Sequence, residues 1–379
     1  MKKLIGIVLT VSLLLPLTQR ARGLEIGGKS AVLMDSATGT VLYEKNAHEP
    51  LAPASVTKVM TMLLIMEEID SGRLQWEDPV TVSETAAAKG GSQIYLKVGE
   101  TMSVSDMVKS IAVSSANDCA CAMAEHLAGS EAAFVDRMNE KARALGMKQT
   151  HFVNCTGLDD APEAREHRTT AYDIALMSAQ LLTAHADIKK YTTIWTDSVR
   201  DGAFGLANTN KLVRFYPGCT GLKTGFTADA GFCLSASALR DGMELVAVVM
   251  GCETSGERFG ACRALLDHGF ANFARIEPEW EPGQTVPVKL GKEAQVPVEP
   301  AEIPKLLIEK RQKQEITTRL ELEEAVTAPV SRGQRLGTLT VQAGEQVLAQ
   351  IPLVAGEAVQ RRSWLDLFCD VLGKAAMTR

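Results

Sequence analysis

Apolar and polar residues alternate along the stretch SAVLMDSATGTVLYEKN, which begins at Ser30 and turns at Ala37-Thr38-Gly39. Period-two alternation on both sides of a glycine-containing turn predicts a β-hairpin. Further along, the runs GLKTGFT, AGFCLSASA and MELVAVVMG predict three more strands, the last ending at Gly251. Strands are therefore expected near both ends of the first apolar region.

Between and after these strands, apolar residues recur with helical spacing. The stretch APASVTKVMTMLL (residues 52–64) is apolar around most of its circumference and predicts a buried helix that begins near Pro53, a residue suited to a first turn. A helix of small residues is expected at 117–127, ended by Gly129, and Ser130 is placed to cap the next, amphipathic helix. Two further helices are predicted at residues 169–182 and 255–273.

The order of these elements favours an α/β (α+β) fold, in which one antiparallel sheet pairs its first and last strands and a helical lobe is inserted. The composition changes near residue 276, because eight of the fourteen prolines lie between Pro278 and Pro352, among alternating runs such as TVPVKL and GTLTVQ. This pattern predicts a small β-rich second domain. We therefore assign residues 24–275 to the first domain and 276–360 to the second.

Residues 1–23 have the pattern of a secretory signal peptide. Lys2 and Lys3 precede an apolar run over residues 4–15, and the small residues Ala21 and Gly23 suit cleavage. The run is shorter than the roughly 20 residues of a membrane-spanning helix. Cleavage near Gly23 leaves 36 basic against 46 acidic residues, a formal net charge of −10 that argues against a nucleic-acid partner. We expect an exported protein.

The eight cysteines are spread from Cys119 to Cys369 without the compact spacing of a disulfide framework. Cys119 and Cys121 are two positions apart in a predicted helix, so they point to different faces and cannot bridge each other. We interpret most of the cysteines as small buried hydrophobes. The sequence shows no CxxC pair, clustered His/Cys spacing, phosphate-binding glycine loop or dinucleotide fingerprint, so neither a metal nor another cofactor is expected.

The first turn of the buried helix at 52–64 carries two polar residues, Ser55 and Lys58. They lie three positions apart on one helix face, and the helix N-terminus places Ser55 in a positive field. A lysine amine acts as a base only after losing its proton, and burial and a second nearby cation both lower its pKa. The pair is a candidate nucleophile and base, although a capping serine and a surface lysine would give the same pattern.

Two other short motifs are candidates for the same cleft. Lys223-Thr224-Gly225 lies in a predicted strand and offers the second cation, and a glycine inside a strand marks the close approach of another backbone, such as a peptide along a sheet edge. Ser115 and Asn117 stand just before the small-residue helix, where they could also form a simple N-cap. Each motif alone is weak, but all three lie at element boundaries, from which side chains can project into one cleft.

In this order, the motifs SVTK, SAN and KTG resemble those of the penicillin-recognising serine enzymes. Within that superfamily the chain is more similar to the serine-type D-alanyl-D-alanine carboxypeptidases, which are low-molecular-weight penicillin-binding proteins. The similarity continues through PASVTKVMT, SSANDCACAMAEHLAGS, THFVNCTGL and GLKTGFT, and it covers nearly the whole chain after the signal. It implies a β-lactamase/transpeptidase-like domain followed by a β-rich domain.

The resemblance implies a carboxypeptidase that removes the terminal D-alanine from the pentapeptide stems of peptidoglycan, is inhibited by β-lactam antibiotics and serves cell wall biogenesis. Ser55 would be the nucleophile, and Lys58 would take its proton. Ser115 and Lys223 would relay a proton to the departing D-alanine, while Asn117 would bind the substrate backbone and hold Lys58. No cofactor is implied.

Substrate binding is implied for the strand motif and for the residue that follows it. The terminal carboxylate would meet Lys223 and Thr224 beside Gly225, and the oxyanion would lie between the N–H groups of Ser55 and Phe226. Many relatives carry histidine at the position of Phe226. This departure bears on substrate preference or pH profile rather than on activity, because only the N–H of this residue is needed.

A β-lactamase of the same superfamily is the main alternative, together with a DD-endopeptidase. Class A β-lactamases deacylate rapidly with a dedicated glutamate, and the stretch TGLDDAPEAREHRTT has Glu163 and Glu166 but lacks the expected E-x-x-L-N pattern. The interval of 60 residues from Ser55 to Ser115 leaves no room for a large inserted domain, which favours the carboxypeptidase. A non-catalytic antibiotic sensor or wall-binding module is a further alternative, which release of D-alanine would exclude.

The last nineteen residues, 361–379, predict an amphipathic helix with an acidic side opposite an apolar arc. The segment is too short and too charged to span a bilayer. The resemblance implies that it lies on the outer face of the cytoplasmic membrane, and docking on the β-rich domain is the alternative. The apolar arc comprises Trp364, Leu365, Leu367, Phe368, Val371 and Leu372.

Overall fold

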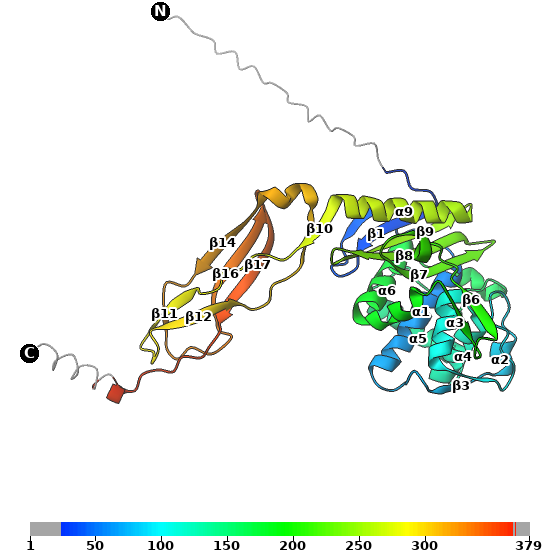
Figure 1. Ribbon diagram of the computed structural model, residues 1–379, viewed down its shortest axis with the longest axis horizontal. Coiled ribbons are helices and arrows are strands. Elements are labelled where there is room, and N and C mark those ends of the chain that lie inside the picture. The colour runs from blue at the N-terminus through cyan, green and yellow to red at the C-terminus, as the bar shows by residue number, and fades with distance from the viewer. Residues whose placement is uncertain (1–23, 367, 369–379) are drawn as a thin grey trace, which may run out of the picture.

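The computed structural model describes residues 24–366 and residue 368. Its larger unit contains a five-stranded antiparallel sheet with the order β2-β1-β9-β8-β7 (Figure 1). The first and last strands of the unit pair, as the sequence predicts. The strands are β1 (Ser30–Asp35), β2 (Val41–Lys45), β7 (Cys219–Thr227), β8 (Gly231–Arg240) and β9 (Met243–Cys252).

Helices cover both faces of this sheet, with α9 on one face and the helical lobe on the other (Figure 1). Strand β1 shows the division: Val32 and Met34 belong to the core of the lobe, whereas Ala31 and Leu33 pack in the core that contains α9. Successive side chains of a strand point to opposite faces, so a central strand between two helical layers is apolar on both. The mixed fold with an antiparallel sheet and a helical lobe is thus confirmed.

The helical lobe contains the buried helix that the sequence predicts, but that helix begins later than expected. Residues Ala54–Thr57 form a 3₁₀ turn, η1, and the α-helix α1 starts only at Lys58. The other helices of this unit are α2 (Glu84–Ala87), α3 (Val104–Ser114), α4 (Asn117–Ala128), α5 (Glu131–Ala144), η2 (Pro162–Glu166), α6 (Ala171–Ala184), η3 (Ala186–Ile188), α7 (Lys189–Thr192), α8 (Leu212–Phe215) and α9 (Ser255–Asn272).

Local signals place the junction between α4 and α5 as predicted. Gly129 ends α4 with a φ of +79°, a conformation that favours glycine because it has no Cβ. The hydroxyl of Ser130 then accepts a hydrogen bond from the N–H of Ala133 and caps α5. Two short antiparallel strand pairs complete the lobe: β3 (Pro79–Thr81) pairs with β4 (Thr101–Ser103), and β5 (Thr196–Val199) pairs with β6 (Phe204–Ala207).

A smaller β-rich unit follows α9 and lies beside the larger one (Figure 1). Its six-stranded sheet has the order β14-β16-β17-β12-β11-β15, and a separate pair, β10 with β13, leads into it. Arg275 of β10 forms a 2.6 Å ion pair with the buried Asp35, which ties this connection to the larger unit. The elements are β10 (Phe273–Ile276), β11 (Thr285–Lys289), β12 (Gln295–Pro300), β13 (Leu306–Glu309), η4 (Lys310–Glu315), β14 (Ile316–Leu322), β15 (Val326–Thr327), β16 (Arg335–Ala343) and β17 (Gln346–Ala355).

Seven cysteines lie in the described part of the chain, and all of them are free thiols. Six are buried and Cys219 is partly exposed, which fits their interpretation as small buried hydrophobes. No helix of the described part has the length and apolarity needed to cross a membrane. The predicted signal peptide, 1–23, and most of the predicted terminal helix, 361–379, lie outside the described residues.

Candidate active site

The predicted nucleophile and base are in direct contact at the start of the buried helix. Lys58 Nζ donates to Ser55 Oγ at 2.9 Å and to the carbonyl oxygen of Thr156 at 2.8 Å. Lys58 has no exposed surface, although a lysine is almost never fully buried unless it is paired. Burial lowers the pKa of Lys58 to about 7, against opposing effects of Cys155 and Asp118. Near neutral pH the amine can therefore accept a proton from the Ser55 hydroxyl.

The backbone around Ser55 is held in an unusual conformation. Ala54 has a φ of +48°, which is uncommon for a residue with a Cβ, and its carbonyl accepts a 2.8 Å hydrogen bond from the Thr57 hydroxyl. Gly157 lies so close that an added Cβ would come within 1.9 Å of the Ala54 oxygen. The turn that carries the nucleophile is therefore fixed by contacts from a distant loop rather than by helix propensity.

A buried histidine supports the same turn. His167 Nε2 lies 2.8 Å from Thr57 Oγ1, and its Nδ1 accepts from the N–H of Val153 at 3.2 Å. Because Nδ1 is an acceptor, Nε2 carries the proton and donates to the threonine hydroxyl. Burial lowers the pKa of His167 to about 3, so the imidazole is neutral.

The edge strand β7 packs against this turn, as the glycine in its motif predicts. A Cβ added to Gly225 would lie 2.6 Å from the oxygen of Pro53 and 3.1 Å from the nitrogen of Ser55. The strand belongs to the edge of the sheet, so one of its sides is free of a neighbouring strand of that sheet. A peptide laid along this free edge of β7 would pass beside Ser55.

Lys223 lies on β7, is fully buried and donates to the carbonyl oxygen of Thr224 at 2.8 Å. Burial lowers the pKa of Lys223 well below its usual value, and the positive charges of Lys58 and Arg258 lower it further. The sequence predicts that burial and a second cation together lower the pKa of Lys58. In the structure, burial is what lowers the pKa of Lys58, whereas the repulsion between the two amines further lowers the pKa of Lys223.

Thr224 and Phe226 complete the strand motif in different ways. The hydroxyl of Thr224 donates to the hydroxyl of Thr209 at 2.7 Å, which orients it at the edge of β7. Phe226 is 56% exposed and stacks on Phe232 of β8, with ring centroids 4.2 Å apart. Its side chain therefore faces solvent, and its backbone follows Gly225, the residue that packs against Pro53 and Ser55.

Ser115 and Asn117 lie at the junction of α3 and α4. Ser115 ends α3 with a φ of +66°, and Asn117 is the first residue of α4, whose N-cap is Ala116 without a side-chain cap bond. The alternative of a simple N-cap is therefore wrong. Positive φ in a serine is a strained conformation that concentrates at functional sites.

The Asn117 side chain is held from one end only. Its Nδ2 donates to the carbonyl of Gly90 at 2.7 Å, whereas its Oδ1 is buried and has no hydrogen-bond partner within the described residues. The bonds of the Lys58 amine go to Ser55 and Thr156, so the expected contact between Asn117 and Lys58 is not present in this structure. A buried acceptor without a partner is costly unless a ligand supplies a donor.

Several residues of the site were not identified from the sequence. Thr156 contributes a backbone carbonyl, which leaves no sequence signal. Arg258 of α9 donates to the carbonyl of Gly225 at 2.9 Å, yet in the sequence it is one polar residue of an ordinary helix. Within the described residues, no group of three or more His, Cys, Asp or Glu side chains is placed to hold a metal ion.

Comparison with known proteins shows the family of this chain. A sequence model of the family described as D-alanyl-D-alanine carboxypeptidase matches residues 17–254. The chain belongs to this family. A second model, described as penicillin-binding protein 5, C-terminal domain, matches residues 280–361 and covers the β-rich unit.

Relatives and solved structures are similar over most of the chain. D-alanyl-D-alanine carboxypeptidase DacF of Bacillus subtilis (strain 168) is 42% identical over 352 residues, covering 91% of this chain and 89% of the relative. Penicillin-binding protein 5 from Haemophilus influenzae is 28% identical with a TM-score of 0.75, covering 89% of this chain and 98% of that chain. Penicillin-binding protein D2 from Listeria monocytogenes, in its ampicillin-bound form, is 32% identical with a TM-score of 0.60, covering 65% and 99%.

Proposed function

We propose that this protein is a serine carboxypeptidase that removes the terminal D-alanine from the stem peptides of peptidoglycan. The observation that carries the proposal is the 2.9 Å contact between Ser55 Oγ and the fully buried Lys58 amine, beside the edge strand that holds Lys223. Acyl transfer needs a deprotonated lysine next to a serine hydroxyl, and here the pair lies beside an edge strand along which a peptide can bind. Family membership supports the same reaction.

Acylation begins when Ser55 Oγ attacks the carbonyl carbon between the last two D-alanines and its proton passes to Lys58 Nζ. The negative charge on the carbonyl oxygen is stabilised by the N–H groups of Ser55 and Phe226, and the close approach of Gly225, the residue before Phe226, to Pro53 and Ser55 supports this arrangement. The C–N bond then breaks. The proton reaches the leaving amine through Ser115 and Lys223, and free D-alanine departs.

The substrate completes the charge balance of the site. Its terminal carboxylate binds Lys223 and the hydroxyl of Thr224, which turns its proton from Thr209 to the carboxylate, and an anion beside the buried Lys223 amine favours the ammonium form. The Oδ1 of Asn117, which lacks a partner within the described residues, accepts a hydrogen bond from a backbone N–H of the stem peptide. Water then attacks the acyl-Ser55 ester, Lys58 takes its proton, and the shortened peptide leaves.

The proposal is tested by replacing the nucleophile. Ser55→Ala removes the attacking oxygen and is expected to abolish both covalent labelling by penicillin and release of D-alanine from a pentapeptide, with the melting temperature retained. Mass spectrometry of the peptide products and of the penicillin-treated protein measures both. Release of D-alanine by the folded variant would refute the proposed role of Ser55.

The β-lactamase alternative is not favoured by the geometry. Glu163 and Glu166 both belong to the turn η2, and both residues are exposed to solvent. A penicillin adduct on Ser55 is therefore expected to be long-lived, whereas rapid turnover of penicillin would support the lactamase. Endopeptidase activity uses the same attack by Ser55, and a cross-linked stem-peptide dimer offered beside the pentapeptide distinguishes the two.

We further propose that the protein is exported and associates with the outer face of the cytoplasmic membrane through its C-terminal segment. The support is the pattern of residues 1–23 and the exposed apolar side chains Trp364, Leu365 and Phe368 at the start of the predicted helix. A chain truncated after Gln360 should lose binding to anionic lipid vesicles while keeping its penicillin labelling. Equal vesicle binding by both forms would contradict the anchoring.

A further inference from the structure

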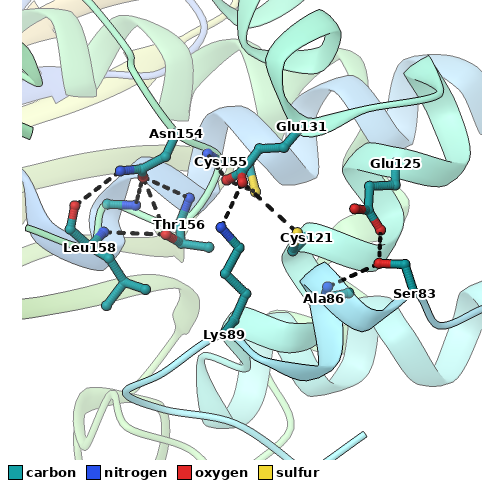
Figure 2. Close-up of polar contacts among 11 residues, drawn as sticks. Ser83, Ala86, Lys89, Cys121, Glu125, Glu131, Asn154, Cys155, Thr156 and Leu158 are labelled. Carbon is teal, nitrogen blue, oxygen red and sulfur yellow. Dashed lines mark hydrogen bonds and ion pairs between the residues drawn. The ribbon is translucent and has the colours of Figure 1, made fainter. Parts of the chain in front are cut away.

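A partly buried carboxylate contacts the loop that carries Thr156 without touching any of the predicted catalytic residues. Glu131, the first residue of α5, accepts hydrogen bonds at Oε1 from the backbone N–H of Cys155 and from its thiol, both at 3.2 Å. At Oε2 it forms a 2.6 Å ion pair with Lys89, and the Cys121 thiol lies 3.9 Å away (Figure 2). One side chain therefore joins two separate loops.

The first loop positions the catalytic base. Cys155 precedes Thr156, whose carbonyl accepts from Lys58 Nζ at 2.8 Å. The Cys155 carbonyl is fixed by the hydroxyl of Thr61 at 2.7 Å, so Glu131 holds the other polar group of the same residue. Figure 2 also shows Asn154 bonded to the peptide groups that follow, which closes the loop into a compact turn. The orientation of the Thr156 carbonyl thus depends on Glu131 for one of its anchors.

The second loop positions the substrate-binding amide. Lys89 is followed by Gly90, whose carbonyl accepts from Asn117 Nδ2 at 2.7 Å. Gly91 has a φ of +71°, and a Cβ there would lie 2.8 Å from the same nitrogen. The ion pair with Glu131 holds Lys89, the residue directly before the one that contacts Asn117.

The ion pair between these groups is well shielded. The Lys89 and Glu131 side chains are 22% and 18% exposed, so solvent screens the pair less than it would at the surface. Burial raises the pKa of Glu131, but the bonds from Lys89 and Cys155 outweigh it and the net pKa is lowered. The carboxylate is therefore ionised at neutral pH. The titratable groups that face it are Lys89, Cys121 and Cys155.

We propose that Glu131 is a positioning residue that couples the Lys58 base to the Asn117 amide by holding the loops of Thr156 and Gly90 in register. The inference rests on the proposed function, because it concerns the efficiency of the same acyl transfer. Its physical basis is that a displacement of about 1 Å in a catalytic group can lower a rate about 100-fold. Glu131 itself contacts neither the substrate nor Ser55.

Two variants of the ion pair separate the loops. Glu131→Gln removes the ion pair with Lys89 and also replaces the charged acceptor of the Cys155 N–H by a neutral amide oxygen, so it affects both loops, and the rate of acylation by a penicillin should fall at least tenfold. Lys89→Met leaves the Cys155 contact intact and should act through Asn117, raising KM for a pentapeptide more than it lowers kcat. Lys89→Arg preserves the ion pair and should restore most of the lost efficiency.

A matched control removes a similar carboxylate far from the site. Glu68 pairs with Arg73 and Arg137 near the end of α1, about 15 Å along the helix from Lys58 at 1.5 Å per residue. Glu68→Gln should lower the melting temperature but leave the acylation rate within twofold of the wild type. Rates are normalised to the amount of protein that saturating penicillin labels, so that unfolded molecules are not counted.

The inference is overturned if folded Glu131→Gln acylates within twofold of the wild type, or if Glu68→Gln loses rate equally. If Glu131→Gln does not fold, the comparison of Lys89→Met with Lys89→Arg decides, and equal efficiency in these two overturns it. A wild-type protein that is labelled by penicillin but releases no D-alanine would refute the proposed function alone. The acylation rates would still test the positioning role.

Discussion

The two units of the molecule bury different kinds of side chains. In the larger unit the buried residues include Lys58, Lys223, Asp118 and Arg258, whereas the described residues of the β-rich unit bury only apolar side chains. Removing charges from water costs several kcal/mol each unless bonds compensate. Buried charges therefore lower the stability of the larger unit, where the proposed chemistry needs groups shielded from water. The core of the β-rich unit carries no such penalty, because its described buried side chains are apolar.

The backbone differs in the same way. Within the larger unit, Ala54 and Ser115 hold positive φ values directly beside predicted catalytic groups. The cores of β11, β12, β16 and β17 are instead built by regular alternation, with Val286, Val296 and Leu353 fully buried. Shielded polar groups mark the unit that carries the candidate site, so changes in the two units should separate activity from stability.

Among changes that leave the nucleophile Ser55 in place, the largest effect on activity is expected from Lys58→Met. Loss of the general base should lower the rate of acylation by about 100- to 10,000-fold. The melting temperature should be unchanged or higher, because a buried amine is replaced by an apolar side chain of similar length. Stopped-flow or mass-spectrometric acylation and thermal unfolding measure the two quantities. A variant that is less stable than the wild type but acylates at the same rate would contradict the view that the buried charge serves activity rather than stability.

A smaller effect is expected from Gly225→Ala, which places a methyl group 2.6 Å from the oxygen of Pro53. Strand β7 must move away from η1, so the oxyanion donors separate and the acylation rate should fall about 100-fold. The overpacking should also lower the free energy of unfolding by about 1–3 kcal/mol. Gly205→Ala, where an added Cβ meets nothing within 4 Å, is the matched control. Equal rates in the two variants would contradict the close packing.

The pH dependence of acylation should follow the protonation of Lys58. Its pKa of about 7 means that the free amine predominates above this pH, so the rate should fall about tenfold per pH unit below it. The free energy of unfolding should also depend on pH. Between pH 7 and 10.5, the usual pKa of a lysine, the unfolded chain binds a proton at Lys58 that the folded chain does not, so stability rises with pH. Lys223, whose pKa is also lowered, adds in the same direction.

The stability difference between wild type and Lys58→Met isolates this contribution. The advantage of the methionine variant in denaturant titrations should shrink as the pH is raised from 7 to 10. An advantage that stays constant over this range would show that the buried amine is not the source of the penalty.

The smallest effect on activity is expected from Leu353→Ala in the β-rich unit. The fully buried side chain leaves a cavity that should cost about 2–5 kcal/mol in the unfolding of that unit. The acylation rate should remain within twofold of the wild type, because the site lies in the other unit. Hydrogen exchange resolved by segment measures the local loss. A parallel loss of acylation would show that the β-rich unit supports the active site.

Much of the architecture could be predicted from local patterns. Alternation identified the hairpin of β1 and β2 and the strands of the second unit, and the capping serine at 130 and the glycine at 129 located the junction of α4 and α5. These features depend on residues close together in the sequence. The start of α1 was expected too early, because Ala54 takes a positive φ that is fixed by Thr57 and by the distant Gly157.

The sequence by itself determined which groups are available: a serine and a lysine one helical turn apart, a second lysine in a glycine-containing strand, and a serine and an asparagine at a helix boundary. Only the tertiary structure decided what these groups can do. Burial, which lowers the pKa of Lys58, is a property of the surrounding layers, and the carbonyls that hold Lys58 and Asn117 come from backbone far along the chain. Backbone partners and desolvation leave no trace in residue identity, because any residue can supply a carbonyl and only packing removes water.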